Sequence, residues 1–325
     1  MTAEMASAPV AGFSDRLAGF DEHWRSIEPE LKRIESGRWL SLIGGGVLCV
    51  LALPAFVLGI ALADWLFDPA AGSDGPWLAG ALLGAGTFMI GAFIAHAPSR
   101  NAGLLIKERV ARFLGFSYQE DAPDFPLGAF DGSDILPSYS GKSLQDHIRG
   151  EVSGVPITMC DAELTERRGS GKGSRTVTVF RGPLVVSVFP KPSTGRTIVV
   201  PDGGAIGNFF AGRGQDVGQR VKLESPDFER AFEVYSSDQV EARYLLTPAM
   251  MERLLAFRAR FGSRIRLAFA ERELLIAIDD RRDWFPDPGL FQKLTDPALV
   301  RDQAEEIARI AKIVETLKLN AETRI

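Results

Sequence analysis

The sequence predicts an α+β protein in which an N-terminal two-helix transmembrane hairpin precedes a mainly antiparallel-sheet cytoplasmic domain with flanking helices. Two long uncharged stretches near the N-terminus predict the hairpin. Short apolar segments between glycine-rich turns, followed by helical patterns, predict the domain. We therefore divide the chain into a cytoplasmic amphipathic segment (1–38), the hairpin (39–97) and the cytoplasmic domain with its C-terminal helix (98–325).

The two uncharged stretches have the lengths of membrane spans. Residues 39–63 number about 25, which makes roughly 37 Å of helix against a hydrocarbon core of about 30 Å. Residues 76–97 number about 22 and are richer in glycine. Trp39, Trp65 and Trp77 mark the ends of these stretches, and tryptophan prefers the headgroup boundary. We therefore expect two spans rather than two buried core helices.

Gly80 and Gly84 in the second stretch form a pair of small residues four positions apart, a spacing that lets helix backbones approach closely. We favour packing against the first helix of the same chain, and the alternative is a homo-oligomer through this face. Neither stretch contains an acidic or basic side chain, whereas transport paths normally need ionisable groups. The hairpin is therefore predicted to be an anchor rather than a pore.

Lysine and arginine residues set the predicted orientation. Basic residues lie on both flanks of the hairpin, whereas the connecting loop 64–75 has none and carries three aspartates. The basic residues are Arg25, Lys32, Arg33, Arg38, Arg100, Lys107, Arg109 and Arg112. The positive-inside rule then places both termini in the cytoplasm of a multi-pass inner-membrane protein that has the lipid bilayer as a partner.

Amphipathic helices are predicted on both sides of the hairpin. An apolar stripe runs from Phe13 to Ile34, and Pro29 is expected to break it into two helices near Glu28. Residues 99–114 continue the second span, and a second stripe at 300–317 predicts a C-terminal helix. We expect each stripe to cover the globular domain, and the alternative is that the two helices pair.

The cytoplasmic domain is predicted to contain several short strands and a helix. The strands are expected at 148–152, 155–164, 176–180, 184–189, 197–200, 264–269 and 274–278. Gly182-Pro183 is predicted to turn a hairpin, and residues 202–218 form a glycine-rich loop. Thr247-Pro248 is a strong helix start, because threonine caps free N–H groups and proline fits the first helical position, and Gly262 is placed to end that helix.

Several functions are excluded by composition and motifs. The formal net charge of -5 argues against nucleic-acid binding. Cys49 and Cys160 lie in an apolar stretch and a strand, so no structural disulfide is expected. No His/Cys/Asp cluster has zinc spacing, and the segments at Gly141-Lys142-Ser143 and Gly171-Lys172 fail the phosphate-loop pattern. The sequence therefore predicts no metal and no cofactor.

One segment of the domain is similar to a known family. The similar residues are Leu223–Tyr235, Asp238, Glu241–Pro248 and Met251-Glu252, together with an upstream turn at Phe180–Leu184. Together they resemble the hallmark segment of a bacterial membrane-protein family catalogued as domain of unknown function 3137. The resemblance covers roughly residues 113–280 and implies a bacterial membrane protein with a cytoplasmic domain. It implies no established reaction and no catalytic residues.

The same segment carries the candidates for an enzymatic site. A membrane-bound enzyme with a carboxylate–arginine site in residues 224–248 would use Glu229, Glu233, Glu241 and Arg243 for acid/base or metal chemistry. We favour the alternative in which the neighbouring aromatic residues anchor the core while these charged groups face water or pair with each other. An enzyme would gather them in one pocket, whereas a binding module would spread them.

A basic loop offers a second candidate surface. Arg167, Arg168, Lys172 and Arg175 surround a run of glycine and serine. They are candidates for contact with anionic lipid headgroups, where each charge contributes about 1 kcal/mol. The alternative, which we favour, is a solvated hairpin tip.

The leading hypothesis from the sequence is a non-enzymatic membrane-anchored module that binds a protein or other ligand, or acts as a scaffold, at the inner face of the membrane. It rests on the anchor-like hairpin, the absence of catalytic motifs and the flanking amphipathic helices. The second hypothesis is the enzyme, and the third is a transporter or channel subunit that would need oligomerisation to line a path.

Overall fold

The computed structural model describes residues 19–67, 74–169, 171–191, 193, 195–202, 218–262 and 264–317. They fall into two compact units, which we describe separately. The hairpin unit comprises Gly19–Arg109 and Pro286–Asp302, and the described part of the sheet unit lies within Val110–Phe285 and Gln303–Ile325. The predicted loop at 203–217 and the start of the N-terminal stripe lie outside the described residues.

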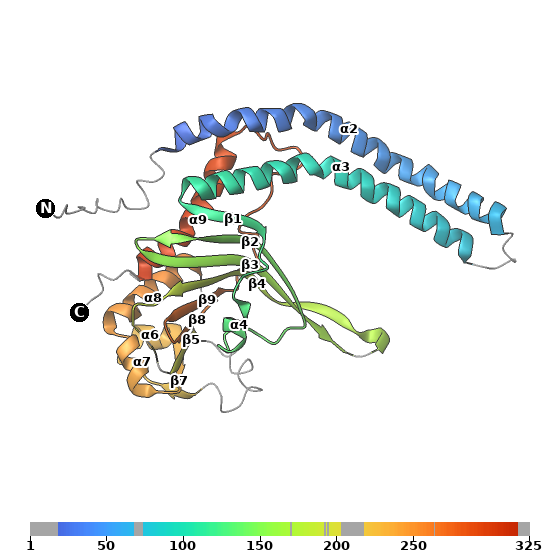
Figure 1. Cartoon of the computed structure of the whole chain (residues 1–325). Helices are drawn as coiled ribbons and strands as arrows, with labels where there is room; N and C mark the ends of the chain where they lie inside the picture. The colour runs from blue at the N-terminus through green and yellow to red at the C-terminus, as the bar shows by residue number, and fades with distance from the viewer. Residues whose placement is uncertain are drawn as a thin grey trace. The chain divides into compact units, whose positions relative to one another are not determined.

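Two long helices form the body of the hairpin unit. Helix α2 spans Phe20–Phe67 and helix α3 spans Gly75–Phe113, and Figure 1 shows them running side by side. Both are long and apolar enough to cross a membrane. Only 11% and 17% of their most apolar windows are buried, so their apolar side chains face outward, unlike those of a core helix in a soluble protein.

Helix α2 continues without interruption through Pro29 and Pro54, so the predicted break near Glu28 is wrong. A proline inside a helix costs about 3 kcal/mol. Ile27 and Leu31, on either side of Pro29, are fully buried, and each such burial contributes about 1.5–3 kcal/mol. Packing of this face therefore offsets the lost backbone hydrogen bond. Helix α3 extends beyond the second uncharged stretch as predicted.

Glycines bring the two helices of the hairpin into close contact. A Cβ atom added to Gly80 would lie 2.7 Å from the backbone oxygen of Phe56, and one added to Gly84 would lie 2.9 Å from the Phe56 Cβ. A Cβ on Gly91 would lie 2.7 Å from the backbone oxygen of Gly45. Gly80 and Gly84 thus face the first helix of the same chain. Beyond the uncharged stretches, an ion pair of 2.7 Å between Arg109 and Glu30 joins the helices again.

The sheet unit is built on a nine-stranded sheet in which every pairing is antiparallel. The strand order is β1-β2-β3-β4-β9-β8-β5-β7-β6. The strands are β1 Phe116–Asp121, β2 Gly141–Val152, β3 Val155–Arg168, β4 Arg175–Val188, β5 Arg196–Pro201, β6 Gln219–Val221, β7 Phe232–Ser236, β8 Ile265–Ala270 and β9 Glu273–Ile278. The antiparallel sheet with its helices confirms the predicted α+β class.

The remaining helices surround this sheet or follow it. They are α4 Leu127–Asp131, the short 3-10 turn η2 Gly171–Gly173, α6 Pro226–Ala231, α7 Gln239–Leu245, α8 Pro248–Phe261 and α9 Pro297–Leu317. Helix α8 begins and ends where the sequence predicts: Thr247 caps it, and Gly262 follows its last residue with φ +102°. The first residues of α9 belong to the hairpin unit and the rest to the sheet unit.

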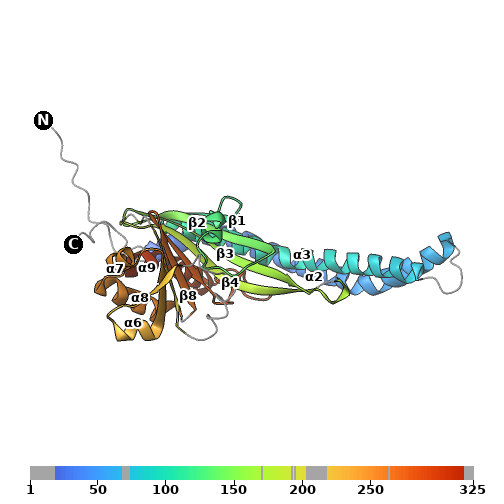
Figure 2. The ribbon, with the colours of Figure 1, turned by 90° about the horizontal axis from the view of Figure 1, so that it is seen from below.

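The course of strand β4 shows that one predicted hairpin is wrong. It runs unbroken through Gly182-Pro183, where a turn was expected. β3 pairs with β4 over its whole length, and β9 joins β4 only from Leu184 onward. Gly182 has φ +139°, and a Cβ there would lie 2.3 Å from the backbone oxygen of Ile278. The glycine therefore permits the close approach of β9 rather than a reversal of the chain. The long β3–β4 ribbon extends beyond the rest of the sheet in Figure 2.

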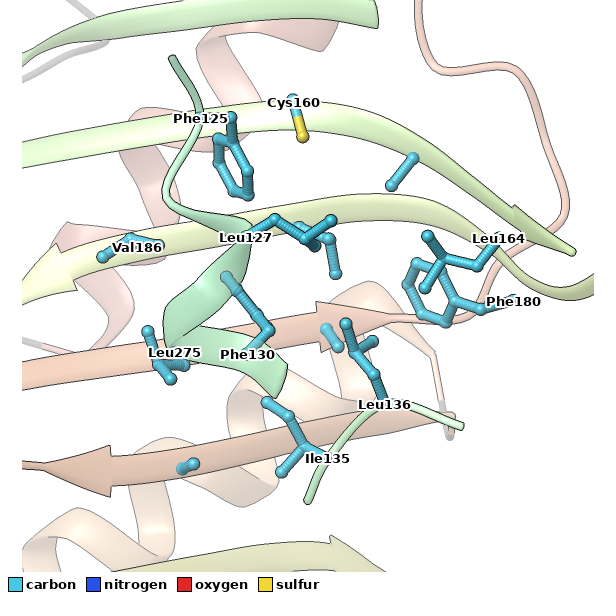
Figure 3. Packing of buried hydrophobic residues seen from close by; sticks show 14 of the residues in the cluster. Phe125, Leu127, Phe130, Ile135, Leu136, Cys160, Leu164, Phe180, Val186 and Leu275 are labelled. Carbon is cyan, nitrogen blue, oxygen red and sulfur yellow. The ribbon is translucent and has the colours of Figure 1, made fainter. Parts of the chain in front are cut away.

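Both faces of the central strands are buried. Figure 3 shows one face, where Leu127 and Phe130 of α4 and the following Ile135 and Leu136 pack on β3, β4 and β9. Alternate residues of the same strands point to the opposite face, on which α6, α7, α8 and the end of α9 gather (Figure 1). Cys160 lies in this core and Cys49 in α2, and both are free thiols, as expected.

The close helix contact at Gly91 predicts that substitutions at two glycines of α3 will have very different effects on stability. Gly91→Leu should lower the thermal stability of the hairpin in detergent or lipid, because a side chain there must displace the backbone of α2. Overpacking of this kind costs about 1–3 kcal/mol. Circular dichroism of the purified chain during heating measures the change.

Gly86→Leu is the matched control, because a Cβ at Gly86 meets nothing within 4 Å among the described residues. Its melting temperature should stay within a degree or two of the parent, since exposed surface substitutions usually change stability little. Equal losses in the two variants would contradict the packing.

Candidate ligand-binding pocket

A concave pocket of about 400 Å³ lies in the sheet unit, between the end of β4 and the helices α7 and α8. Its lining residues are Phe189, Pro190, Lys191, Arg243, Tyr244, Leu245, Thr247, Ala249, Met250 and Arg253. Cavities that bind small molecules typically measure about 300–1,000 Å³ and are mostly apolar with a few polar groups. The pocket therefore has the size and the mixed lining of a ligand site.

Capping interactions fix the two helices that form one wall. The Asp238 carboxylate accepts hydrogen bonds from the N–H groups of Val240 and Glu241, at 2.8 and 3.1 Å, and so starts α7. The Thr247 hydroxyl accepts from the N–H of Met250 at 3.3 Å and starts α8. Only Leu246 and Thr247 separate the two helices, so the end of α7 and the first turn of α8 face the same space.

Buried apolar side chains form the floor. Leu245 and Met250 are buried, and Phe189 is 2% exposed. The Phe189 ring meets Phe269 edge-on with centroids 4.9 Å apart, and its N–H donates to the backbone oxygen of Arg272 at 2.7 Å. This floor is fixed by the sheet behind it, so it is formed before any ligand arrives.

Three cationic side chains are among the residues that line the pocket. Lys191 Nζ lies 4.3 Å from the centroid of the Tyr244 ring and donates to the Tyr244 backbone oxygen at 3.2 Å. Arg243 donates to the backbone oxygen of Gln239 at 3.1 Å. Arg253 reaches only the backbone oxygen of Leu317, at 3.5 Å. Among the described residues these contacts are all to neutral groups.

No aspartate or glutamate lines the pocket within the part of the chain that the structure describes. Like-signed charges held near one another favour a counter-ion. The arrangement suits a ligand with an apolar body and an anionic group. The apolar floor takes the body, and Lys191, Arg243 and Arg253 face the anion.

The carboxylates predicted for an enzymatic site lie apart from one another. Glu229 accepts a hydrogen bond from the Leu223 N–H at 2.9 Å. Glu233 on β7 pairs with Arg220 at 3.2 Å and accepts from the Tyr235 hydroxyl at 2.9 Å. Glu241 accepts from the Gly195 N–H at 2.7 Å. Each thus fixes a separate piece of local structure.

The predicted residues thus divide between roles. Of the predicted set, Arg243 alone is among the residues that line the pocket. Phe228 and Phe232 are fully buried core anchors, their ring centroids 5.1 Å apart.

The basic residues proposed for lipid contact lie at the tip of the β3–β4 ribbon. Arg167, Arg168 and Arg175 are exposed there. Arg167 donates to the Ser174 hydroxyl at 3.1 Å, and Arg168 pairs with Glu166 at 2.7 Å. Lys172 belongs to the turn η2, and its side chain lies outside the described residues. Part of this charge is therefore compensated locally.

A buried acidic group lies elsewhere in the sheet unit. Burial, together with the nearby carboxylates of Asp283 and Asp146, raises the pKa of Asp161 to about 7, although Arg181 opposes this shift. One carboxylate oxygen of Asp161 is buried without a hydrogen-bond partner. Asp146 lies in a bulge of β2, with φ +52°, and accepts from the Tyr118 hydroxyl at 2.7 Å.

Perturbed pKa values often mark functional sites, although structural networks perturb them as well. His147, next to the bulge, is 1% exposed, and burial lowers its pKa. Within the described residues, no group of three or more His, Cys, Asp or Glu is placed to hold a metal ion. We assign Asp161 and His147 to the structure of the sheet rather than to a site.

Sequence reasoning located only part of the pocket. It found the start of α8 at Thr247-Pro248 and named Arg243, but it missed Lys191 and Arg253. Lys191 follows a strand whose course was predicted wrongly, so its position beside α7 was hidden. Arg253 falls on the helical pattern of α8, where an arginine normally indicates a solvated face.

Comparison with known proteins shows a similarity to one protein family. Residues 178–319 match the family described as "Protein of unknown function (DUF3137)", a range that includes the pocket. Among solved structures, the mycobacterial trehalose monomycolate transport factor A, TtfA, is similar with a TM-score of 0.36 and 12% identity over 67% of this chain and 96% of that chain. A likeness of this size carries no argument about function. No curated protein matches the sequence significantly.

The raised pKa of Asp161 predicts a pH dependence of stability. The folded chain holds this proton up to about pH 7, whereas an unfolded chain releases it near 3.8. The stability that Asp161 contributes is therefore present below about pH 4 and is lost as the pH rises to about 7. Relative to Asp161→Asn, which does not titrate, the wild-type free energy of unfolding should fall over this range and then level off.

Chemical unfolding of the full chain in neutral detergent at several pH values between 4 and 8 measures this difference. Glu151→Gln, which alters an exposed carboxylate on β2, serves as the control. A wild-type-minus-variant difference that stays constant across the range would rule out the raised pKa.

Proposed function

We propose that this chain, whose residues 178–319 match the family of proteins of unknown function DUF3137, is a membrane-anchored binding module that holds an acidic amphiphile in the α7–α8 pocket. The hairpin of α2 and α3 is the anchor, and the sheet unit carries the site. The observation that carries the proposal is the pocket itself, whose described lining residues include an apolar floor and three cations but no carboxylate.

The exposed surface of the hairpin supports the anchor. Leu53, Leu82 and Phe93 are 72%, 68% and 66% exposed, and they are typical of the uncharged stretches. Apolar surface in water costs about 25 cal/mol per Å², a cost that a lipid environment removes. We therefore keep the division into 1–38, the spans within 39–97 and 98–325 as part of the proposal.

The distribution of basic residues supports an orientation with both termini in the cytoplasm of a bacterial inner membrane. Arg25 and Arg33 precede the first span, and Arg100 and Arg112 follow the second. The described residues of the loop between the spans include Asp64 and no lysine or arginine. This asymmetry is the one on which the positive-inside rule depends.

The other two hypotheses receive less support. The separate hydrogen-bond partners of Glu229, Glu233 and Glu241 count against an enzyme built on them, because catalysis needs these groups within reach of one reacting atom. A transporter would need ionisable groups within the spans, and only His96, at the very end of the second, lies there. A protein partner or a second copy remains a prediction, to be tested by crosslinking in intact membranes.

The orientation predicts opposite labelling of two cysteines. Asp74→Cys, at the loop between the spans, should react with a membrane-impermeant thiol reagent in right-side-out vesicles. Glu151→Cys on β2 should react only in inside-out vesicles or after permeabilisation. Gel-shift assays with a thiol-reactive polymer measure both. Accessibility of both positions from the same side would overturn the anchor, since the spans would then not cross.

The pocket predicts selective binding of an amphiphilic anion. A photoreactive fatty acid should crosslink the full chain, in nanodiscs of neutral lipid, at peptides that contain residues 243–253. Laurate should compete for the site. Dodecanol should not, because it lacks the anionic group, and acetate should not, because it lacks the apolar chain. Lysophosphatidylglycerol tests whether a lipid headgroup supplies the anion equally well.

Removing two of the cations should weaken this binding. The double variant Arg243→Gln and Arg253→Gln should lose tenfold or more in half-saturating concentration, because a hydrogen bond to a charged group contributes about 1.5–3 kcal/mol. Arg230→Gln is the matched control, since Arg230 is exposed and pairs with Asp227 away from the pocket. Competition by a peptide with an apolar C-terminal residue, but not by laurate, would contradict the lipid-like ligand.

A further inference from the structure

Residues 286–296, which we call the strap, lie against the first helix of the hairpin unit. The Arg38 guanidinium is buried and donates hydrogen bonds to the backbone oxygens of Leu290 and Gln292. The Glu35 carboxylate accepts from the Leu294 N–H at 2.8 Å and also pairs with Arg38 at 3.3 Å. Two charged side chains of α2 therefore bind the backbone of three alternate strap residues, Leu290, Gln292 and Leu294.

The strap also contacts the second helix. Lys107 is buried, and its ammonium group lies 3.2 Å from the Asp287 carboxylate. A Cβ added to Gly103 would lie 2.3 Å from the same carboxylate and 3.1 Å from Pro288, so the strap runs close to the backbone of α3. Removing one partner of a buried charge pair is costly, and the strap is therefore fixed to both helices.

These contacts fix the level of the strap along the hairpin. Arg38 immediately precedes Trp39, where the uncharged stretch begins. Farther along α2, Gly45 contacts Gly91 and Ala95 of α3. Because the helices are antiparallel, seven residues back from Gly45 on one helix corresponds to about seven residues forward on the other. Arg38 therefore lies level with the region of α3 near Gly103, where the strap crosses.

Phe291 projects from the strap at this level. It lies between the two residues whose carbonyls Arg38 holds, and its side chain is 82% exposed. Outside the two long helices it is the most exposed large apolar side chain of the described residues, and Lys293 beside it is exposed as well. We propose that Phe291 inserts into the headgroup region of the bilayer next to Trp39, as a third contact of the anchor besides the two spans.

This inference rests on the proposed membrane anchor, and it explains why a large apolar side chain is presented to the outside. The ring of Phe291 is stabilised when it leaves water for the apolar part of the bilayer surface. Lys293 adds attraction to anionic headgroups, as polybasic segments next to spans do. Trp39, itself 70% exposed, marks the same boundary on α2. The strap backbone, held by Arg38, places the ring without a further helix.

Spin labelling tests the depth of position 291 in the full chain. Phe291→Cys is combined with Cys49→Ala, and the remaining native Cys160 is buried and does not react. Leu53→Cys in the middle of the first span and Val240→Cys in the sheet unit, both highly exposed side chains, are the references. The labelled chains are placed as single copies in nanodiscs that contain anionic lipid, and the accessibilities to oxygen and to a water-soluble nickel complex are compared.

The label at 291 should show an oxygen-to-nickel ratio between those at 53 and 240, at the value of the headgroup region. A ratio at 291 equal to that at 240, with a lipid-like ratio at 53, would overturn the inference and leave the anchor standing. A water-like ratio at 53 would overturn both. An immobilised label at 291 that neither probe reaches would mean that protein covers this position, which also overturns lipid insertion.

Discussion

The structure depends on keeping one uncharged surface out of water. Residues 39–63 of α2 and 76–97 of α3 include no aspartate, glutamate, lysine or arginine, and most of their large apolar side chains point outward. Within the pair, glycines of α3 meet the backbone of α2 and the Phe56 side chain directly, so the two helices approach closely. Close packing of backbones holds such a pair together in lipid, where the hydrophobic effect no longer drives association. In water the same pair would have no means of covering its surface.

Beyond the uncharged stretches, the hairpin helices carry charged side chains that have partners. Arg38, Lys107 and Arg109 each find a partner within the hairpin unit, either a carboxylate or a backbone oxygen. These are residues that the sequence counts only as basic flanks. If the hairpin has the proposed orientation, the same charges orient the spans and also fix the strap to the helices. The strap is held because Arg38 and Lys107 are buried and paired, so that loss of one partner is costly.

How far the sequence predicts the fold depends on whether a signal is local. The two long apolar helices, the cap at Thr247, the stop at Gly262 and the β8–β9 hairpin are set by residues near one another, and the structure has them where they were expected. Gly182-Pro183 misled because its glycine serves a contact with Ile278, nearly a hundred residues away. The prediction of a helix break at Pro29 was wrong because burial of the neighbouring residues outweighs the tendency of proline to break a helix.

The pocket shows the same limit for function. Its three cations are Lys191, Arg243 and Arg253, and no motif relates their spacing in the chain. They meet because β4 ends beside α7 and because a two-residue link turns α8 back toward that point. In a solvated surface such charges would separate or pair with carboxylates. Here the described partners are carbonyl oxygens and an aromatic ring, which position a cation without neutralising it. Positive charge kept at the edge of an apolar cavity is what recognition of an amphiphilic anion requires.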